Sequence, residues 1–327
     1  MLMRYGFLGP ETTFTHQALL QALAQTPRTR TAEDAPELRP FPSVAAATTA
    51  LVEGEIDAIM APIENSVEGG VSGTLDVLAA TKRITIVAEQ VVPITFVLAA
   101  RPGTALADVR AVASHPHAQA QVQGWIRANL PGASVEPASS TAAAAQSLAE
   151  ASEEEAHGRA AVCSPLAAEH FGLDVLARGI EDNRGAQTRF VLVTRNHRIP
   201  PRTGADKTTL VVHLAHNRAG ALLEMLELFN ANGVNLSRIE SRPIGDALGR
   251  YSFSLDVEGH LEDRRVAAAL RSLHRVCPVV HYLGSYPRAD GVRSTVAEAT
   301  DDAAYDDARA WVDALSEMIT PGESAGE

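Results

Sequence analysis

The sequence has few cysteines, few aromatic residues and no long hydrophobic run. Only Cys163 and Cys277 occur among its 327 residues, and their wide spacing argues against a disulfide scaffold or a structural zinc site. No apolar stretch approaches the roughly 20 residues that span a bilayer, so we expect no membrane association. The segment Met1–Leu8 lacks the basic and apolar regions of a signal peptide, and we therefore expect a cytoplasmic protein.

Positive charge is also scarce. The chain has 28 Lys and Arg residues against 40 Asp and Glu residues, which gives a formal net charge of −12. This balance disfavours nucleic acid as a partner, because nucleic-acid binding depends on cations that neutralise phosphates. Residues 289–327 contribute −8 of that charge, so the preceding part of the chain carries only a small acidic excess.

Motifs for metal ions and nucleotides are missing as well. The histidines, among them His213 and His216, show no HExxH or related spacing. Gly69, Gly70 and Gly73 form neither a GxGxxG nor a Walker pattern. We therefore expect no metal site, no cofactor and no nucleotide.

Short apolar strands alternate with helical patterns over the first 195 residues. This alternation predicts an α/β region with a mainly parallel sheet. Two strands follow each other directly between Ile84 and Ala99, where we expect the chain to pass from one lobe (about 1–93 and 180–195) to another (about 94–179). The predicted strands are Arg4–Leu8, Ala58–Pro62, Ile84–Val91, Thr95–Ala99, Ala111–Ser114, Ser134–Pro137, Arg159–Cys163 and Arg189–Thr194.

A second domain is predicted after a linker. Residues 196–206 are rich in proline, glycine and charge, which is typical of a linker. Residues 207–287 show the order βαββαβ of the ferredoxin-like class, which alone predicts no function. Residues 288–327 form an acidic tail in which Ala303–Ile319 has the pattern of an amphipathic helix. The six predicted elements of the domain are Lys207–Ala215, Ala219–Ala231, Asn235–Ile244, Arg250–Glu258, Leu261–Val276 and Val279–Tyr286.

Hydroxyl side chains stand at the start of several predicted helices. Each alone is an ordinary helix cap. Together they lie where strands end, and helix N-termini at that edge of an α/β sheet attract anions. The pattern favours a small anionic substrate. The segments are Glu11-Thr12-Thr13-Phe14, Ser72-Gly73-Thr74, Ser114-His115-Pro116, Ser139-Ser140-Thr141 and Ser164-Pro165.

Several longer phrases are more specific. The first domain contains Gly9-Pro10-Glu11-Thr12-Thr13-Phe14-Thr15-His16, Pro62-Ile63-Glu64-Asn65-Ser66 with Thr74-Leu75-Asp76, and Thr188-Arg189-Phe190. The second contains Gly220-Ala221-Leu222 and Asn235-Leu236-Ser237-Arg238-Ile239-Glu240-Ser241-Arg242-Pro243. In this order they resemble prephenate dehydratase and its ACT regulatory domain, from residue 4 to about 287. The chain departs from the family at Thr12, His117 and Ala219, where the family usually has Gly, Gln and Pro.

The resemblance implies both a fold and a reaction. Residues 1–195 are expected to form a two-lobed catalytic region of the periplasmic-binding-protein-like type II class, and residues 207–287 a ferredoxin-like ACT domain. The implied activity is that of a lyase that converts prephenate to phenylpyruvate with loss of water and carbon dioxide. It needs no cofactor, and phenylalanine inhibits it. The short segment before Arg4 leads us to expect a monofunctional enzyme.

The resemblance also implies catalytic residues. Thr188 is expected to hydrogen-bond the leaving hydroxyl group, Arg189 to bind a carboxylate in bidentate fashion, and Phe190 to wall the substrate ring. Asn65 and Ser66 would bind a carboxylate through amide and hydroxyl donors. The remaining catalytic candidates are Ser114 and Gln121, whose seven-residue spacing would place both on one face of a helix. Further substrate-binding candidates are Thr13, Thr74 and Ser139.

A phenylalanine pocket is implied in the ACT domain. Because ACT domains pair, we expect a homodimer through these domains, with a tetramer as the larger alternative, and a pocket between two subunits. The implied pocket residues are Gly220, Ala221, Leu222, Asn235, Leu236, Glu240, Ser241, Arg242 and Pro243.

Two alternatives remain open. An arogenate dehydratase would use the same cleft on an aminated substrate. A non-catalytic amino-acid-binding sensor would keep the two lobes and the ACT pocket without turnover. The retained candidates Asn65, Ser114, Gln121, Thr188 and Arg189 disfavour the sensor.

Overall fold

The chain divides into two compact units, Met1–Arg198 and Ile199–Glu327, each described by itself. The computed structural model describes residues 3–25, 35–195, 198–216, 218–244 and 251–319. Asn196 and His197 of the expected linker, and Arg250 of an expected strand, lie outside these residues. Among the described residues, no helix is long and apolar enough to cross a membrane.

The first sheet of the first unit has the strand order β2-β1-β3-β11-β5, with the short strand β4 paired to β3. Phe7, Leu19 and Phe190 are fully or almost fully buried in the core between this sheet and α1. The strands are β1 (Arg4–Leu8), β2 (Glu37–Phe41), β3 (Ala58–Asn65), β4 (Gly69–Gly70), β5 (Thr85–Pro93) and β11 (Gln187–Thr194). The helices of this lobe are α1 (Phe14–Gln25), α2 (Val44–Glu53) and α3 (Ser72–Ala80).

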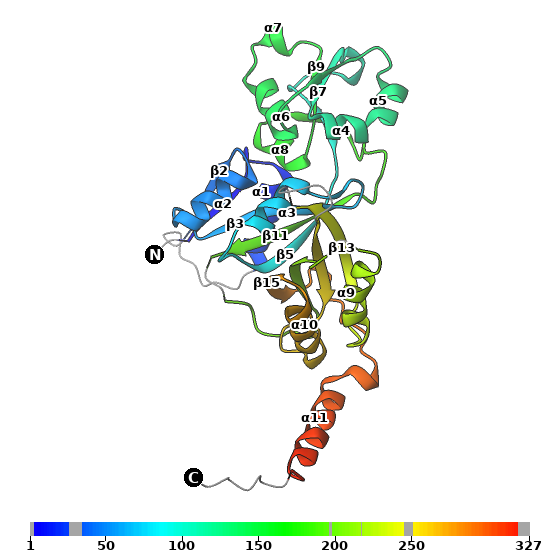
Figure 1. Cartoon of the computed structure of the whole chain (residues 1–327). Coiled ribbons are helices and arrows are strands. Elements are labelled where there is room, and N and C mark those ends of the chain that lie inside the picture. Colours follow the sequence, from blue (N-terminus) through cyan, green and yellow to red (C-terminus); the bar gives the residue numbers. More distant parts are fainter. Residues whose placement is uncertain (1–2, 26–34, 196–197, 217, 245–250, 320–327) are drawn as a thin grey trace. The chain divides into compact units, whose positions relative to one another are not determined.

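The second sheet has the order β10-β6-β9-β7-β8. It has one apolar core on each face, because successive strand residues point alternately to the two faces. Its strands are β6 (Val97–Ala100), β7 (Ala111–Ser114), β8 (Ser134–Pro137), β9 (Arg159–Cys163) and β10 (Asp174–Arg178). Its helices, labelled in Figure 1, are α4 (Pro116–Gln121), α5 (Gln123–Asn129), α6 (Thr141–Glu150), α7 (Glu153–Ala156) and α8 (Pro165–His170). A short 3₁₀ turn, η2, spans Leu106–Asp108.

Both sheets are mixed, so the expectation of a mainly parallel sheet was wrong. In the first, β1 is parallel to β2 and β3, whereas β11 is antiparallel to β3 and β5. In the second, β7 is parallel to β8 and β9, whereas β6 is antiparallel to β9 and β10. The strands that run against their neighbours are β6 and β11, which are the first strands after the chain passes from one sheet to the other, without a helical crossover that would impose a parallel direction.

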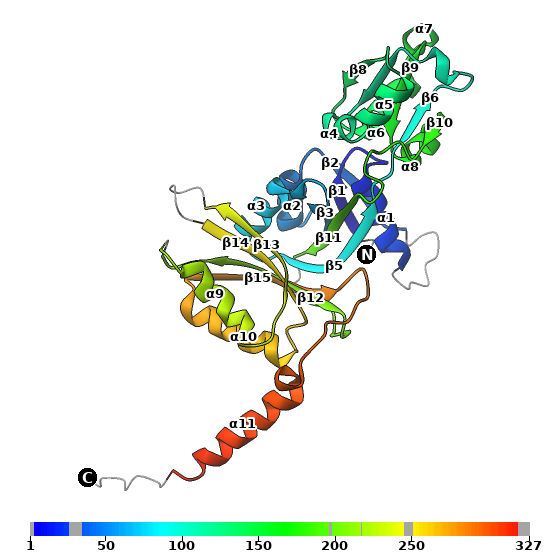
Figure 2. The same cartoon turned by 90° about the vertical axis from the view of Figure 1, so that its right-hand side faces the viewer.

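The second unit carries the expected βαββαβ order. Its antiparallel sheet runs β13-β14-β12-β15, and Figure 2 shows α9 and α10 on one face of it. Leu210, Phe229 and Leu255 belong to the core under these helices. The elements are β12 (Asp206–His213), α9 (Ala221–Asn230), β13 (Leu236–Pro243), β14 (Tyr251–Glu258), α10 (Arg264–Val276) and β15 (Val279–Pro287).

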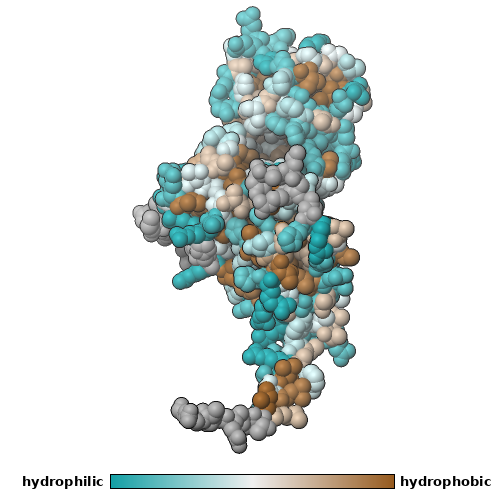
Figure 3. Space-filling model, viewed as in Figure 1, coloured by the Kyte–Doolittle hydropathy of each residue, from teal (hydrophilic) through white to brown (hydrophobic). Residues whose placement is uncertain are grey.

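The acidic tail forms the 3₁₀ turn η3 (Glu298–Thr300) and the helix α11 (Asp302–Ser316). Polar contacts attach its start to the domain, because Tyr305 donates to Asn232 at 2.7 Å and Arg264 pairs with Asp306 at 3.0 Å. Further along α11 the apolar side chains are exposed, with Trp311 64% accessible. Figure 3 shows this end as hydrophobic surface.

Candidate active site

The candidate site lies at one edge of the first sheet. Because β1 and β3 are parallel and β11 runs against β3, the carboxyl ends of β1 and β3 lie at the same edge as the start of β11. Thr188 is the register partner of Asn65 there. The Asn65 Nδ2 donates to the Thr188 Oγ1 at 2.9 Å, and Thr188 is only 8% exposed. The structure therefore brings together two candidates that are 123 positions apart in sequence.

The turn after β3 holds the Asn65 amide in this orientation. Its Oδ1 accepts from the main-chain N–H of Val67 at 2.8 Å and of Glu68 at 3.2 Å. The Oγ of Ser66 accepts from the main-chain N–H of Gln187 at 2.9 Å. Ser66 thus ties the turn to the strand that carries Thr188, which is a structural use of its hydroxyl group rather than the expected contact with a carboxylate.

Arg189 is held by carboxylates of the protein itself. Its Nε lies 3.1 Å from Glu64 and its Nη1 lies 3.0 Å from Glu89, and the Arg189 and Glu89 side chains are both buried. A guanidinium in this position neutralises the buried Glu89, and breaking such a pair is costly. The bidentate grip on a substrate carboxylate that the sequence suggested is not the arrangement observed. The geometry makes Arg189 a support for Glu64 and Glu89.

Phe190 is a core residue. It is 2% exposed and packs with Tyr5, Phe7 and Val92. Its ring is therefore enclosed by the first lobe and does not present the substrate-facing wall expected from the sequence. The motif Thr188-Arg189-Phe190 therefore contributes one hydroxyl group, that of Thr188, to the edge of the site. Arg189 is a buried cation and Phe190 is a core residue.

In the second lobe, Ser114 lies at the end of β7, before the helix begins at Pro116. The expectation that Ser114 and Gln121 share a helix face was therefore wrong, because Ser114 has strand conformation. The Ser114 hydroxyl is fully buried and donates to the main-chain oxygen of Val162 at 2.7 Å. The Gln121 side chain is half-buried at the end of α4, where the Gln121 main-chain oxygen accepts from the main-chain N–H of Asp182 at 2.7 Å.

The three substrate-binding candidates differ in their surroundings. Thr13 donates to the main-chain oxygen of Leu8 at 2.9 Å and closes the turn after β1. Ser139 is exposed, next to Ser140, whose Oγ caps α6 by accepting from Ala143 at 2.9 Å. Thr74 is fully buried, and its hydroxyl has no hydrogen-bond partner among the described residues. Such an unpaired buried hydroxyl is uncommon, so Thr74 is the strongest of the three.

Two contacts join the lobes at this edge, and the sequence did not predict either. The Ser164 Oγ donates to the main-chain oxygen of Thr12 at 3.2 Å. The His117 Nδ1 lies 2.7 Å from the Glu68 carboxylate. Burial lowers the pKa of nearby His115, with a further lowering from His117 and an opposing effect of Glu68. The edge of one lobe that carries Thr188 therefore faces the edge of the other that carries Ser164.

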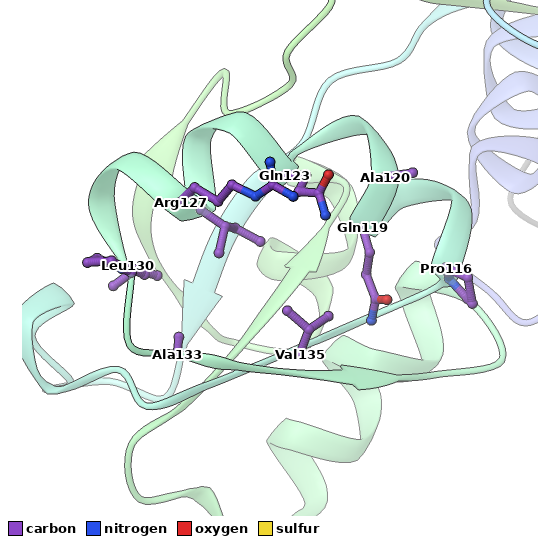
Figure 4. A pocket seen from close by; sticks show the side chains of 10 residues that line it. Pro116, Gln119, Ala120, Gln123, Arg127, Leu130, Ala133 and Val135 are labelled. Atoms are coloured by element: carbon purple, nitrogen blue, oxygen red, sulfur yellow. The ribbon is translucent and has the colours of Figure 1, made fainter.

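The hollow in Figure 4 lies elsewhere in the second lobe. It is formed by α4, α5 and the neighbouring strand β8, with Gln119 and Val135 on its wall. The Gln119 amide is already bonded to the main-chain oxygens of Ser114 at 2.9 Å and Glu136 at 2.6 Å. No group of three or more His, Cys, Asp or Glu side chains suited to a metal ion occurs in the described part of the chain.

The phenylalanine-pocket candidates form two groups. Arg242 of β13 and His213 of β12 both pair with Ser252 of β14, so these three residues lie at the same end of the sheet. The chain leaves β12 at this end and leads to α9. Gly220 starts α9 with φ 84°, a left-handed conformation that favours glycine. Leu236 pairs with Val257, seven residues along β13 from Pro243 and at the opposite end. Within one chain, Asn235 and Leu236 therefore do not meet Gly220–Leu222.

Fold and site define a two-lobed α/β enzyme with an appended ACT-type domain. The prephenate dehydratase family model matches residues 5–198, more than half of the chain, and the ACT domain model matches residues 208–275. The chain belongs to the prephenate dehydratase family. This confirms the family resemblance and, with the sheet topology, the expected two-lobed and ferredoxin-like fold.

Known relatives agree with this assignment. Prephenate dehydratase of Mycobacterium bovis is 44% identical over 286 residues, which cover 88% of this chain and 87% of that protein. Prephenate dehydratase of Mycolicibacterium vanbaalenii is 44% identical and covers 95% of this chain and 98% of its own. A crystal structure of Arthrobacter aurescens prephenate dehydratase with L-Phe is 49% identical, with a TM-score of 0.87 over 96% of this chain and 100% of that one.

Proposed function

We propose that this chain converts prephenate to phenylpyruvate, water and carbon dioxide, and that phenylalanine inhibits it through the ACT domain. The observation that carries this proposal is the Asn65–Thr188 hydrogen bond at the edge where the two lobes meet. Family membership and the relatives named above support the substrate and the effector.

The reaction needs little chemistry from the protein. Aromatisation of the ring drives the departure of the hydroxyl group and the carboxylate together, with no redox step. The enzyme must orient a dianion and supply a hydrogen bond or proton to the leaving hydroxyl group. Hydroxyl and amide donors at the edge where the lobes meet suit that task.

Thr188 is the residue we assign to the leaving hydroxyl group. Its oxygen accepts from Asn65, so its own proton can be directed toward the substrate. A threonine hydroxyl is a weak acid, and therefore water or a neighbouring group shares the proton transfer. Thr74 and Gln121 remain the candidates for direct substrate contact, while Arg189 and Phe190 position the strand.

Substitution of Thr188 tests the assignment. Thr188→Ala removes the hydroxyl group, and we expect kcat to fall about 100-fold or more, the range for one lost transition-state hydrogen bond or proton relay. Thr188→Ser keeps the hydroxyl and should retain activity within about tenfold. Phenylpyruvate formation from prephenate, followed by ultraviolet absorbance, gives both values.

Outcomes that contradict the proposal are clear. Equal kcat for Thr188→Ala and the wild type would show that the Thr188 hydroxyl takes no part in the reaction. A folded wild-type protein, checked by circular dichroism, that forms no phenylpyruvate would remove the proposed activity. If arogenate is used with a higher kcat/KM than prephenate, the chain is an arogenate dehydratase. Calorimetric binding of phenylalanine without turnover of either compound would indicate the sensor.

The assembly and location are also proposals. A homodimer through ACT domains would bring Asn235 and Leu236 of one copy to Gly220–Leu222 of another, and a tetramer would be a pair of such dimers. Sedimentation with and without phenylalanine measures the stoichiometry. We further propose that the reaction takes place in the cytoplasm, which cell fractionation tests.

A further inference from the structure

The turn between β1 and α1 contains a residue in an unusual conformation. Thr12 has φ 66°, in the left-handed region that favours glycine, and is 2% exposed. A non-glycine residue persists there only when its surroundings hold it. The resemblance to a family that usually has Gly at this position fits that backbone geometry.

The polar groups of Thr12 are all bonded. Its main-chain N–H donates to the His16 Nδ1 at 3.0 Å, and its hydroxyl donates to the main-chain oxygen of Glu11 at 2.6 Å. Its main-chain oxygen accepts from the Ser164 hydroxyl, which belongs to the other lobe. The same Ser164 oxygen caps α8 by accepting from the N–H of Ala167 at 3.1 Å. Thr12 is thus held by His16 on one side and joins the second lobe on the other.

His16 is itself fixed by stacking. Its ring lies parallel to Phe7 of β1, with ring centroids 4.5 Å apart and an interplanar angle of 11°. Because the Nδ1 accepts a hydrogen bond from Thr12, this nitrogen carries no proton, and the neutral ring has its proton on Nε2. His16 therefore holds the strained turn only as a neutral imidazole.

We propose that neutral His16 is a positioning residue of the dehydratase reaction, which holds Thr12 in place so that its carbonyl accepts from the Ser164 hydroxyl of the other lobe. The residue touches neither Thr188 nor Asn65 in the contacts described, and it acts through the turn. The expected effect of His16 on turnover rests on the proposed function. The hydrogen bonds of His16 and Thr12 do not depend on that function.

Acid should release the turn. Protonation of His16 turns Nδ1 from an acceptor into a donor that faces another N–H, so the Thr12 bond is lost. Burial lowers the pKa of His16, Glu11 of the turn raises it, and His170 of α8 lowers it further. The titratable groups that act on the ring are thus Glu11 and His170. The net lowering keeps His16 neutral near pH 7 and confines the loss to the acidic side.

Two substitutions separate the acceptor from the ring. His16→Phe keeps an aromatic ring against Phe7 and removes the acceptor, which releases the strained turn and leaves the Thr12 N–H unpaired, and we expect kcat/KM to fall about tenfold. His16→Asn places its Oδ1 near the position of Nδ1 and should retain kcat/KM within about threefold at pH 8. Since Asn does not titrate, the part of the acid limb that is due to His16 should disappear in this variant.

A second-site change tests the mechanism. Thr12→Gly adopts the left-handed conformation without steric cost but keeps the main-chain N–H, so His16→Phe combined with Thr12→Gly should recover the part of the lost kcat/KM that comes from the strain of Thr12. Equal kcat/KM and equal pH profiles for His16→Phe and the wild type would overturn the proposal. So would a Thr12→Gly change that leaves the His16→Phe defect unaltered.

A measurement that needs no turnover tests the hydrogen bond between His16 and Thr12 separately from the proposed function. In the full chain labelled with ¹⁵N-threonine, the Thr12 amide signal, assigned by its loss in Thr12→Ser, should shift with the titration of His16. This titration supports the arrangement even if prephenate is not turned over, in which case only the assigned activity fails. A Thr12 signal that does not change through the titration of His16 overturns the inference, whatever the activity.

Discussion

At the residue scale, the site depends on which atom of each side chain donates. Asn65 uses both ends of its amide, since Oδ1 accepts from the turn and Nδ2 donates to Thr188. An amide oxygen could not replace Nδ2, because the Thr188 hydroxyl would then have to donate to it. In the proposed reaction, the direction of this one hydrogen bond would determine whether the Thr188 proton is available to the substrate.

Asn65→Asp tests that direction. The aspartate keeps an acceptor for Val67 and Glu68 but offers only acceptors to Thr188, so the hydroxyl proton is drawn toward Asp and away from the substrate. We expect kcat to fall about 100-fold at pH 8. The circular dichroism spectrum should stay close to that of the wild type. Steady-state kinetics on prephenate measure the change. Ser66→Ala is the matched control, because it loses one turn contact and no donor to Thr188, and a loss as large as that of Asn65→Asp would contradict this account.

At the element scale, the sequence predicted most strands and missed β2, β10 and the two-residue strand β4. β2 contains Pro40 and has no fully buried residue, and β10 is likewise at a sheet edge with mostly half-buried residues. Edge strands lack the apolar run or alternation on which such predictions depend. Strand direction and register were not predictable either, since pairing such as Thr188 with Asn65 joins distant segments.

The same limit applies to the site. Motifs placed Thr188 and Asn65 correctly at strand ends, because those phrases are local. The partners of Arg189 are Glu64 and Glu89, 125 and 100 positions away, and no local pattern connects them. The Ser164 bond to Thr12 spans 152 positions. A departure from glycine at Thr12 was the one local signal that this turn is unusual.

The ACT sheet is stabilised by a cluster of buried polar side chains on neighbouring strands. The fully buried Asp256 on β14 accepts from Arg238 on β13 at 2.8 Å and from Thr209 on β12 at 2.7 Å. Arg238 also donates to Ser254 at 2.9 Å. Removal of one member of such a buried pair leaves the other charge uncompensated.

Asp256→Asn should therefore destabilise the ACT domain by about 3–5 kcal/mol. The exposed pair Arg218–Glu224, 2.8 Å apart in the same unit, provides the control, and Glu224→Gln should cost no more than about 1 kcal/mol. Urea unfolding followed by circular dichroism compares the two variants. Similar midpoints would show that burial of Asp256 does not determine its contribution.

At the scale of the whole molecule, the proposed phenylalanine pocket would need two copies of the chain. Asn235 and Leu236 lie at the far end of β13 from the sheet end that leads to Gly220 and Leu222, and seven strand residues span about 23 Å. A single phenylalanine cannot contact both groups in one chain. In the proposed pocket one group would come from each of two subunits, and effector binding would depend on dimerisation.

Mixing two defective subunits tests this arrangement. Leu222→Glu and Asn235→Ala both change exposed side chains, so folding should persist, and each homodimer should lose most phenylalanine binding because each of its pockets carries the defect. A heterodimer of the two variants has one pocket with both changes and one with neither. We expect calorimetry to find about half of the wild-type sites at wild-type affinity, since two pockets per dimer reduce to one intact pocket. Pockets built within one subunit would instead leave every site defective in the mixture, and phenylalanine would then fail to inhibit the heterodimer.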